Sequence, residues 1–337
     1  MSLATTLAPW QRRGLYIGKQ TVIGTAVRTS MLIANERTRA LPGKNRQIAA
    51  VGHTGRGVPH KVDADYIQGS VIPKVIDTEH SLSATLAHHI FMLMFQANTV
   101  NVGTLYDYDP YTTPAVSKWA TLIGKGFQGS GVHENWEALG AVISRCQIRM
   151  MNASNADGGD VIARLSWDAA NANLDTADPT SGTDDATPYA RTNDCGLTMD
   201  AGGGGALIKF VEATIDIANN ATKVPTNNLT AEAHNLGECA ITGSVKVLLS
   251  STSTDPAAML YTAFRDKTEV QLTWTWAGGS IGTSNVITLG TFFCWITGEP
   301  EEEVQGGVSL ATFPFEVRES ANGSYQFQVN NGAVFTW

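Results

Sequence analysis

Charged side chains are scarce in this sequence. Lys, Arg, Asp and Glu together make up 16% of its 337 residues, against about 25% in an ordinary soluble protein. Hydrophobic residues make up 43%, which is enough for a large core. A surface with so few charges indicates that much of it is covered in a permanent assembly.

Cysteines are also few, and they are isolated from one another. Cys146, Cys195, Cys239 and Cys294 stand too far apart for a CxxC element, and no histidine lies beside them at the short spacing that a zinc site requires. We therefore expect free, buried thiols, and neither a metal site nor a cofactor.

Long apolar runs are missing as well. The first residues, MSLATTLAPWQRRG, lack the apolar stretch of a signal peptide. The longest apolar run, around residues 88–97, is too short to span a bilayer and contains two histidines. We expect that the protein is synthesised in a reducing cytoplasm and that it has no membrane anchoring.

No catalytic signature is present. The sequence contains no GxSxG, HExxH, Walker or Rossmann fingerprint. The carboxylate pairs Asp107/Asp109 and Asp184/Asp185 stand in polar stretches, where aspartate commonly forms turns. The glycine run 202–205 is not followed by the Lys-Ser/Thr of a phosphate loop. We expect no catalytic residue and no enzyme activity.

What the chain does have is a charge asymmetry. Residues 1–61 contain ten Lys/Arg against one acidic residue, a net of +9, and residues 62–337 contain thirteen Lys/Arg against thirty Asp/Glu, a net of −17. One hypothesis is that the basic part docks on an acidic surface of a neighbouring copy. The alternative is a solvated face or a contact within the chain. A nucleic-acid-binding patch is disfavoured, because the basic residues are thinly spread.

The apolar pattern predicts strands along most of the chain and two helices. Asp77 or Thr78 is expected to cap the first helix, and Thr254 or Asp255 the second, with Pro256 in its first position. The expected organisation is an N-terminal extended arm over 1–20, a first β domain over 21–170 with a helix over 78–96, a polar Gly- and Asp-rich loop or linker over 171–205, and a second β domain over 206–337 with a helix over 255–265 and a C-terminal meander.

Several motifs follow one another in an order that is typical of one family. The arm leads to GKQTVIGTAV (18–27), then to DYIQGSVIPKV (65–75) and the helix HSLSATLAHHIFMLMF. ALGAVISRCQIRM is followed by GGDVIARLSW, and AITGSVKVLL by DPAAMLYTAFRDKTEVQLTWTW. This order resembles that of tail tube proteins of bacteriophages with long, non-contractile tails (siphophages). The resemblance covers about residues 15–335, and the segment 168–205 departs from it.

The resemblance implies a fold and an assembly. The fold is mainly β, with tail-tube-like β-sandwich or β-barrel units that each carry one short helix, and with either one unit or two tandem units per chain. Such units form rings of six, which means three or six chains of this kind, and the rings stack into a tube. Its lumen would let genomic DNA pass into the host.

The resemblance also implies partners and a location. The partners are further copies of the chain, tail terminator and tail tip proteins, and double-stranded DNA in transient, non-specific passage. The location is the virion tail, assembled in the cytoplasm of the host bacterium. Six basic residues are hypothesised to lie between subunits or rings and away from the lumen: Arg12, Arg13, Arg37, Arg39, Lys44 and Arg46.

Two other functions remain open at this point. One is a different virion structural protein, although a long capsid-type spine helix is lacking. The other is a carbohydrate-binding or adhesin β-sandwich, which would account for the eight tryptophans. Trp274 and Trp276, however, stand in a strand pattern where aromatic side chains ordinarily pack in a core.

Overall fold

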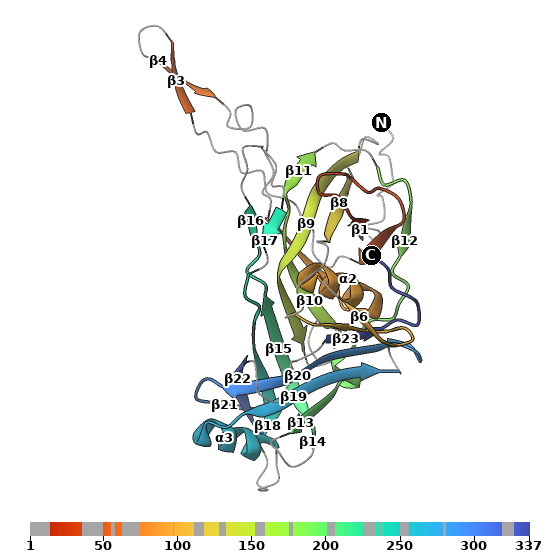
Figure 1. The fold of residues 1–337 in the computed structure, drawn as a ribbon. Helices are drawn as coiled ribbons and strands as arrows, with labels where there is room; N and C mark the ends of the chain where they lie inside the picture. Colours follow the sequence, from red (N-terminus) through yellow and green to blue (C-terminus); the bar gives the residue numbers. More distant parts are fainter. Residues whose placement is uncertain are drawn as a thin grey trace, which may run out of the picture.

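The structure is a computed structural model. It describes residues 14–35, 50–54, 58–62, 75–96, 98–110, 118–127, 133–151, 159–174, 178–200, 206–224, 233–235, 237–249, 256–278, 281–318 and 327–337. The fold is mainly β, as the sequence predicts, and the described ranges contain two α-helices (Figure 1).

The elements have the following bounds. In the first half they are β1 (Gly14–Gln20), β2 (Met31–Asn35), β3 (Ala50–Thr54), β4 (Val58–Val62), β5 (Val75–Ser81), α2 (Ala84–Phe95), β6 (Thr99–Val102), β7 (Leu105–Tyr108), β8 (Trp119–Phe127), β9 (His133–Met150), β10 (Val161–Asp168) and β11 (Asn171–Leu174). In the second half they are β12 (Gly182–Asp184), the 3-10 turn η1 (Thr192–Asp194), β13 (Gly196–Asp200), β14 (Ala206–Ile208), β15 (Phe210–Ala218), β16 (Thr222–Val224), β17 (Ala233–Asn235), β18 (Ala240–Leu248), α3 (Pro256–Asp266), β19 (Val270–Ala277), β20 (Val286–Ile296), β21 (Glu301–Gln305), β22 (Val308–Val317) and β23 (Phe327–Asn330).

Within a 19-stranded sheet, seven consecutive antiparallel strands, which we call the seven-stranded sheet, run through both halves of the chain. Its order is β5–β10–β9–β15–β18–β22–β21, and Figure 1 shows β9, β10 and β15 side by side along the molecule. Because side chains alternate between the two faces of a sheet, one face is apolar. One cross-strand row on that face is almost completely buried and consists of Leu165, Cys146, Ile217, Ile241 and Val317.

Strand β9 belongs to two sheets and turns between them at Gly140. Its first half pairs with β8 and β11, and its second half with β10 and β15. Gly140 has a φ of +61°, a conformation that residues with a Cβ adopt only with strain. Its N–H donates a hydrogen bond to Gln20 Oε1 at 2.8 Å. The glycine therefore allows one strand to serve both sheets.

Helix α2 covers the apolar face. Every residue from Leu86 to Phe95 is buried, and the helix contacts β7, β9, β20 and β23. The predicted helix over 78–96 begins later than expected, at Ala84, because β5 extends to Ser81. Over β5, Thr78 and His80 point to the core while Asp77 and Glu79 alternate outward, and pairing with β10 favours the strand. Ser83 therefore caps the helix and accepts the Leu86 N–H at 3.0 Å.

Helix α3 lies close to its expected position. It runs over Pro256–Asp266, against the predicted 255–265, and contacts β18 and β20. Ala257, Leu260 and Ala263 are its buried residues. Within the described ranges, neither helix is long and apolar enough to cross a membrane.

The segment 171–205 differs from the expected loop or linker. It contains the strands β11, β12 and β13, which pair with β9, β2 and β19. Leu197 and Met199 of β13 are fully buried. These two apolar side chains alternate with polar ones, so the segment supplies short strands to existing sheets although its overall composition is polar.

The C-terminal residues also differ from the expected meander. β23 pairs with β20 and β7, and residues 334–337 form no strand. Instead Phe335 stacks on His88 of α2, with ring centroids 4.7 Å apart, and Trp337 lies edge-on to His89 at 5.9 Å. Packing of these aromatic rings against α2 replaces the last pairing of the predicted meander.

All four cysteines are free thiols. Cys146 and Cys294 are fully buried, and burial raises the pKa of both. Burial also raises the pKa of Cys239 to about 12. These thiols are therefore protonated and unreactive at neutral pH.

The two halves of the chain repeat one set of strand pairings. In the first half β1 pairs with β2 and β8, β8 with β9, β9 with β10, and β10 with β5, which precedes α2. In the second half β13 pairs with β14 and β19, β19 with β20, β21 with β22, and β22 with β18, which precedes α3. The long strand of each half has a positive-φ glycine at an irregularity of its ladder, Gly140 in β9 and Gly290 in β20.

Candidate functional site: a polar sheet face

The second face of the seven-stranded sheet is polar. Residues that pair directly across antiparallel strands lie on the same face, so the registers define this surface, which we call the polar sheet face. The registers also place the buried residues Ser81, Ile162 and Leu310 at its margins, and the other members named below are half-buried or exposed. They are Asp77 and Glu79 of β5, Arg164 and Ser166 of β10, Arg145, Gln147 and Arg149 of β9, Glu212, Thr214 and Asp216 of β15, Thr242, Ser244 and Lys246 of β18, Thr312, Pro314 and Glu316 of β22, and Glu301 and Glu303 of β21.

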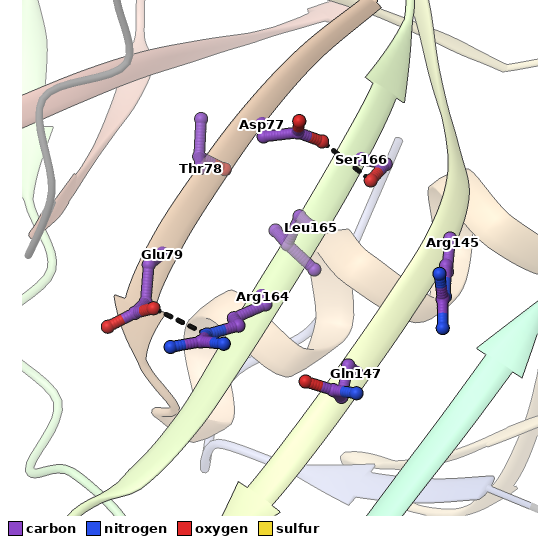
Figure 2. Close-up of a pocket in the computed structure, with 8 residues that line it drawn as sticks. All are labelled: Asp77, Thr78, Glu79, Arg145, Gln147, Arg164, Leu165 and Ser166. Atoms are coloured by element: carbon purple, nitrogen blue, oxygen red, sulfur yellow. Dashed lines mark hydrogen bonds and ion pairs between the residues drawn. The ribbon is translucent and has the colours of Figure 1, made fainter.

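Cross-strand ion pairs connect neighbouring strands of this face. Arg164 Nε donates to Glu79 Oε2 at 2.6 Å, and Ser166 Oγ donates to Asp77 Oδ1 at 2.7 Å. Figure 2 shows these two contacts beside Arg145 and Gln147 of β9.

Arg145 of β9 forms an ion pair with β15, the neighbour of β9 on the side opposite to β10. Its Nε donates to Asp216 Oδ1 at 2.8 Å, and its Nη2 bonds to the other carboxylate oxygen. The hydrogen bonds and charge of Asp216 raise the pKa of Arg145. On a solvated surface each such pair contributes only about 0–1 kcal/mol to stability. The main effect of the pairs is that they occupy the hydrogen-bond donors of the guanidinium groups.

The face is negatively charged overall. It has seven carboxylates and four basic side chains, a net of −3. Lys246 is paired with Glu303, and Arg149 Nη2 lies 3.3 Å from Met151 Sδ. A polyanion near this face therefore meets more carboxylates than cations, and three of the four cations are already paired.

A shallow hollow lies over β5, β10 and β9. Its volume is about 270 Å³. The residues lining it are Asp77, Thr78, Glu79, Arg145, Gln147, Arg164, Leu165 and Ser166 (Figure 2). This lining includes neither a cysteine nor a histidine, and the described part of the chain has no group of three His, Cys, Asp or Glu side chains placed to hold a metal ion. The hollow is a depression in a charged wall.

The adjacent histidines of α2 belong to the core. His88 is fully buried and His89 is 5% exposed. His88 Nδ1 lies 2.6 Å from the Tyr108 hydroxyl, and His89 Nδ1 lies 2.9 Å from the Thr85 carbonyl oxygen. Burial lowers the pKa of His88 to about 3 and that of His89 to about 4. Both rings are therefore neutral at physiological pH.

The residues predicted as inter-subunit contacts, Arg12, Arg13, Arg37, Arg39, Lys44 and Arg46, lie outside the described residues. The polar sheet face was not predicted as a site. One signal for it is in the sequence, because Arg145, Gln147 and Arg149 alternate with Cys146, Ile148 and Met150. The partners from other strands could not be identified from that alternation, since they come from distant parts of the chain.

Comparisons with known proteins give the chain its family. A family model described as phage tail tube protein matches residues 10–317. A search of curated proteins gave no match. The family is one of structural tail proteins and not of enzymes, so the match favours a tail tube subunit over a carbohydrate-binding module. The chain belongs to the phage tail tube protein family, and it is a structural subunit that assembles with other tail proteins into the tube of the virion tail.

Proposed function

We propose that this chain builds stacked rings in the tail of a siphophage and that the polar sheet face lines the lumen through which the genome leaves the virion. The observation that supports this most is the seven-stranded sheet, which is apolar towards α2 and polar with a net charge of −3 on its other face. A closed barrel of such sheets has an apolar shell and a polar, hydrated interior.

The charges of the polar sheet face suit a conduit for DNA. Binding to DNA is dominated by contacts between cations and phosphates. Here Arg164, Arg145 and Lys246 are paired with Glu79, Asp216 and Glu303. A phosphate would have to displace a carboxylate before it could bind. DNA would therefore pass this wall without being retained.

We further propose three chains per ring. Neighbouring strands lie about 4.8 Å apart and barrel strands tilt by about 40°, so that each strand takes up about 6 Å of circumference. Three copies of a seven-stranded sheet would bring about 21 strands, or about 24 with one joining strand per copy, and a width of about 40–50 Å between opposite backbones, whereas six copies would give about 80–95 Å. The smaller barrel leaves room for one duplex inside its side chains. The repeated pairings of the two halves support two tandem tube units per chain and hence six units in a ring of three.

Contacts between subunits and rings would come from the basic N-terminal part of the chain. We propose this role for Arg12, Arg13, Arg37, Arg39, Lys44 and Arg46, because the rest of the chain is acidic. The hairpin β3–β4 projects from the body of the fold (Figure 1), which supports a role in bridging to the next ring. Tail terminator and tail tip proteins would bind the two ends of the tube.

Negative-stain electron microscopy of the purified protein at high concentration tests the proposal. We expect hollow tubes or stacked rings with a pore wide enough for duplex DNA. The mass of a released ring tests the stoichiometry, since three chains of 35.9 kDa give about 108 kDa and six give about 215 kDa. Solid particles without a pore, under conditions that also contain the tail tip complex as an initiator, would contradict the conduit.

A further inference from the structure

We propose that the free edge of β21 binds residues 36–49 of a second copy of this chain, which add as a strand between this β21 and their own β5. The proposal rests on the proposed ring assembly and names the joint that closes it. Four observations support it, each from a different property of the chain.

The first observation is a gap in the repeat. In the second half, β15 lies between β18 of its own half and β9 of the first half. In the repeated set of pairings, β5 of the first half corresponds to β18 of the second half, because each precedes the helix of its half. In the same way the second half of β9, which pairs with β10, corresponds to β21, which pairs with β22. In the described part of the chain, β5 pairs only with β10, and β21 pairs only with β22. Among the described residues the first half therefore has no counterpart of β15, and neither β5 nor β21 has a described partner on the edge where that strand would pair.

The second observation is the exposure of the hairpin β21–β22. All nine residues from Glu301 to Ser309 are exposed, including Val304 at 75% and Val308 at 44%. β22 is anchored by its pairing with β18, whereas β21 pairs along one edge in the described part of the chain and leaves the other edge exposed. An open strand edge is a template for a further strand. A partner strand along β21 would satisfy its backbone groups and cover these valines.

The third observation identifies the partner segment from its place in the chain. β15 follows β14 after one residue, Lys209, and is followed by the hairpin β16–β17 and then β18. β2 is the counterpart of β14, because β1–β2 repeats β13–β14. Residues 36–49 follow β2 directly and precede the hairpin β3–β4 and then β5. The segment 36–49 thus has the sequence position of β15.

The fourth observation is charge complementarity. At the joint inside the chain, β9 carries Arg145 and Arg149 while β15 carries Asp216, which pairs with Arg145. β21 carries the opposite sign at the corresponding edge, with Glu301 and Glu303 on the polar sheet face. The segment 36–49 has four basic residues, Arg37, Arg39, Lys44 and Arg46, and one acidic residue. The joint between copies therefore has the same complementarity with the signs exchanged.

Charge-exchange variants test the joint, with assembly followed by electron microscopy and sedimentation. Glu301→Lys/Glu303→Lys and Arg37→Glu/Arg39→Glu should each abolish tubes, because like charges would then face each other. The fourfold variant should form tubes again, since every joint regains opposite charges. Asp194→Lys/Glu238→Lys is the matched control: it changes the charge equally at exposed positions away from the sheet and should assemble normally.

Cross-linking tests the contact directly. Oxidation of tubes of Arg39→Cys/Glu303→Cys should give a disulfide-linked ladder that ends at the closed ring, and neither single variant should give it. Normal tubes from Glu301→Lys/Glu303→Lys, a fourfold variant that folds but stays dispersed, or tubes of the double cysteine variant without cross-links would each overturn the joint. A wild-type chain that forms no tubes even with the tail tip complex as an initiator would instead contradict the proposed function itself.

Discussion

At the scale of single residues, the cluster around α2 makes stability depend on pH. His88 and His89 share their surroundings with the aromatic rings of Tyr106, Tyr108 and Phe335 and with the ammonium group of Lys19, which lies 4.4 Å from the centre of the Phe335 ring. Burial lowers the pKa of Lys19 as well as the pKa values of both histidines. A proton added here would therefore be both desolvated and close to another cation.

We predict that the free energy of unfolding falls as the pH drops below about 6.5, the ordinary pKa of histidine. The unfolded chain takes up protons from that pH downward. The folded chain does so only near the pKa values of about 4 and about 3 of His89 and His88. The unfolded state thus binds more protons in this window, and each histidine removes about 2 kcal/mol by pH 5.

Urea denaturation of the dispersed protein between pH 7.5 and pH 5 measures this effect. The variant His88→Gln/His89→Gln keeps polar side chains that can bond to the Tyr108 hydroxyl, and it should show a flatter pH dependence whatever its absolute stability. An equal slope in the variant and the wild type would show that other groups cause the acid sensitivity.

Glycine 140 provides a second test at this scale. A Cβ at this position would lie 2.7 Å from Ile23 Cγ1 and 2.9 Å from Ala170 Cβ, in addition to the strain of a φ of +61°. We expect Gly140→Ala to lower the free energy of unfolding by about 2–4 kcal/mol, from strain and overpacking together. Gly103→Ala is the matched control, because its φ is +60° and nothing lies within 4 Å of a Cβ there. A similar loss in both variants, measured by urea denaturation, would contradict the packing argument.

At the scale of elements, the start of α2 depends on Ser83. Its hydroxyl accepts the Leu86 N–H at 3.0 Å and donates to Asp185, so that it links the helix to the segment 178–200. We expect Ser83→Ala to cost about 1–2 kcal/mol of stability, the range for loss of an N-cap. Ser284→Ala, at an exposed turn, should be neutral. The same denaturation assay checks both, and equal stabilities of the two variants would show that the cap is dispensable.

The elements also show what a sequence can predict. The position of α3 follows from local signals, because Pro256 in its first position predicts the start of the helix to within one residue. The start of α2 was placed too early, because the residues over β5 become a strand only through pairing with β10, far along the chain. The prediction of a C-terminal meander was wrong for a similar reason, because Phe335 and Trp337 pack on α2. Local periodicity does not contain these distant contacts.

At the scale of the whole molecule, the polar sheet face shows the same limit. In the sequence, Arg149 alternates with Ile148 and Met150, which indicates that it points outward. The pairs of Arg164 with Glu79 and of Arg145 with Asp216, however, join residues 85 and 71 positions apart. The net charge of the chain, −8, is compatible with many surfaces. Only the registers of the sheet gather seven carboxylates and four cations on one wall.

The pairing on this wall leads to a prediction about DNA. Glu79→Gln/Asp216→Asn would leave Arg164 and Arg145 without their carboxylates and would change the net charge of the face from −3 to −1, while both side chains keep their size. Because free guanidinium groups bind phosphate, assembled tubes of this variant should retain duplex DNA at least about tenfold more tightly at low salt, and added salt should reverse the effect steeply.

Sedimentation of tubes with labelled duplex DNA at several salt concentrations measures this retention. Asp194→Asn/Glu238→Asn changes the charge of the chain by the same amount at exposed positions away from the sheet, and its tubes should behave like wild-type tubes. If both double variants gained affinity equally, the net charge of the particle would control binding and not the wall. A gain confined to Glu79→Gln/Asp216→Asn would mean that DNA touches the polar sheet face, and that carboxylates there keep the guanidinium groups from holding the passing DNA.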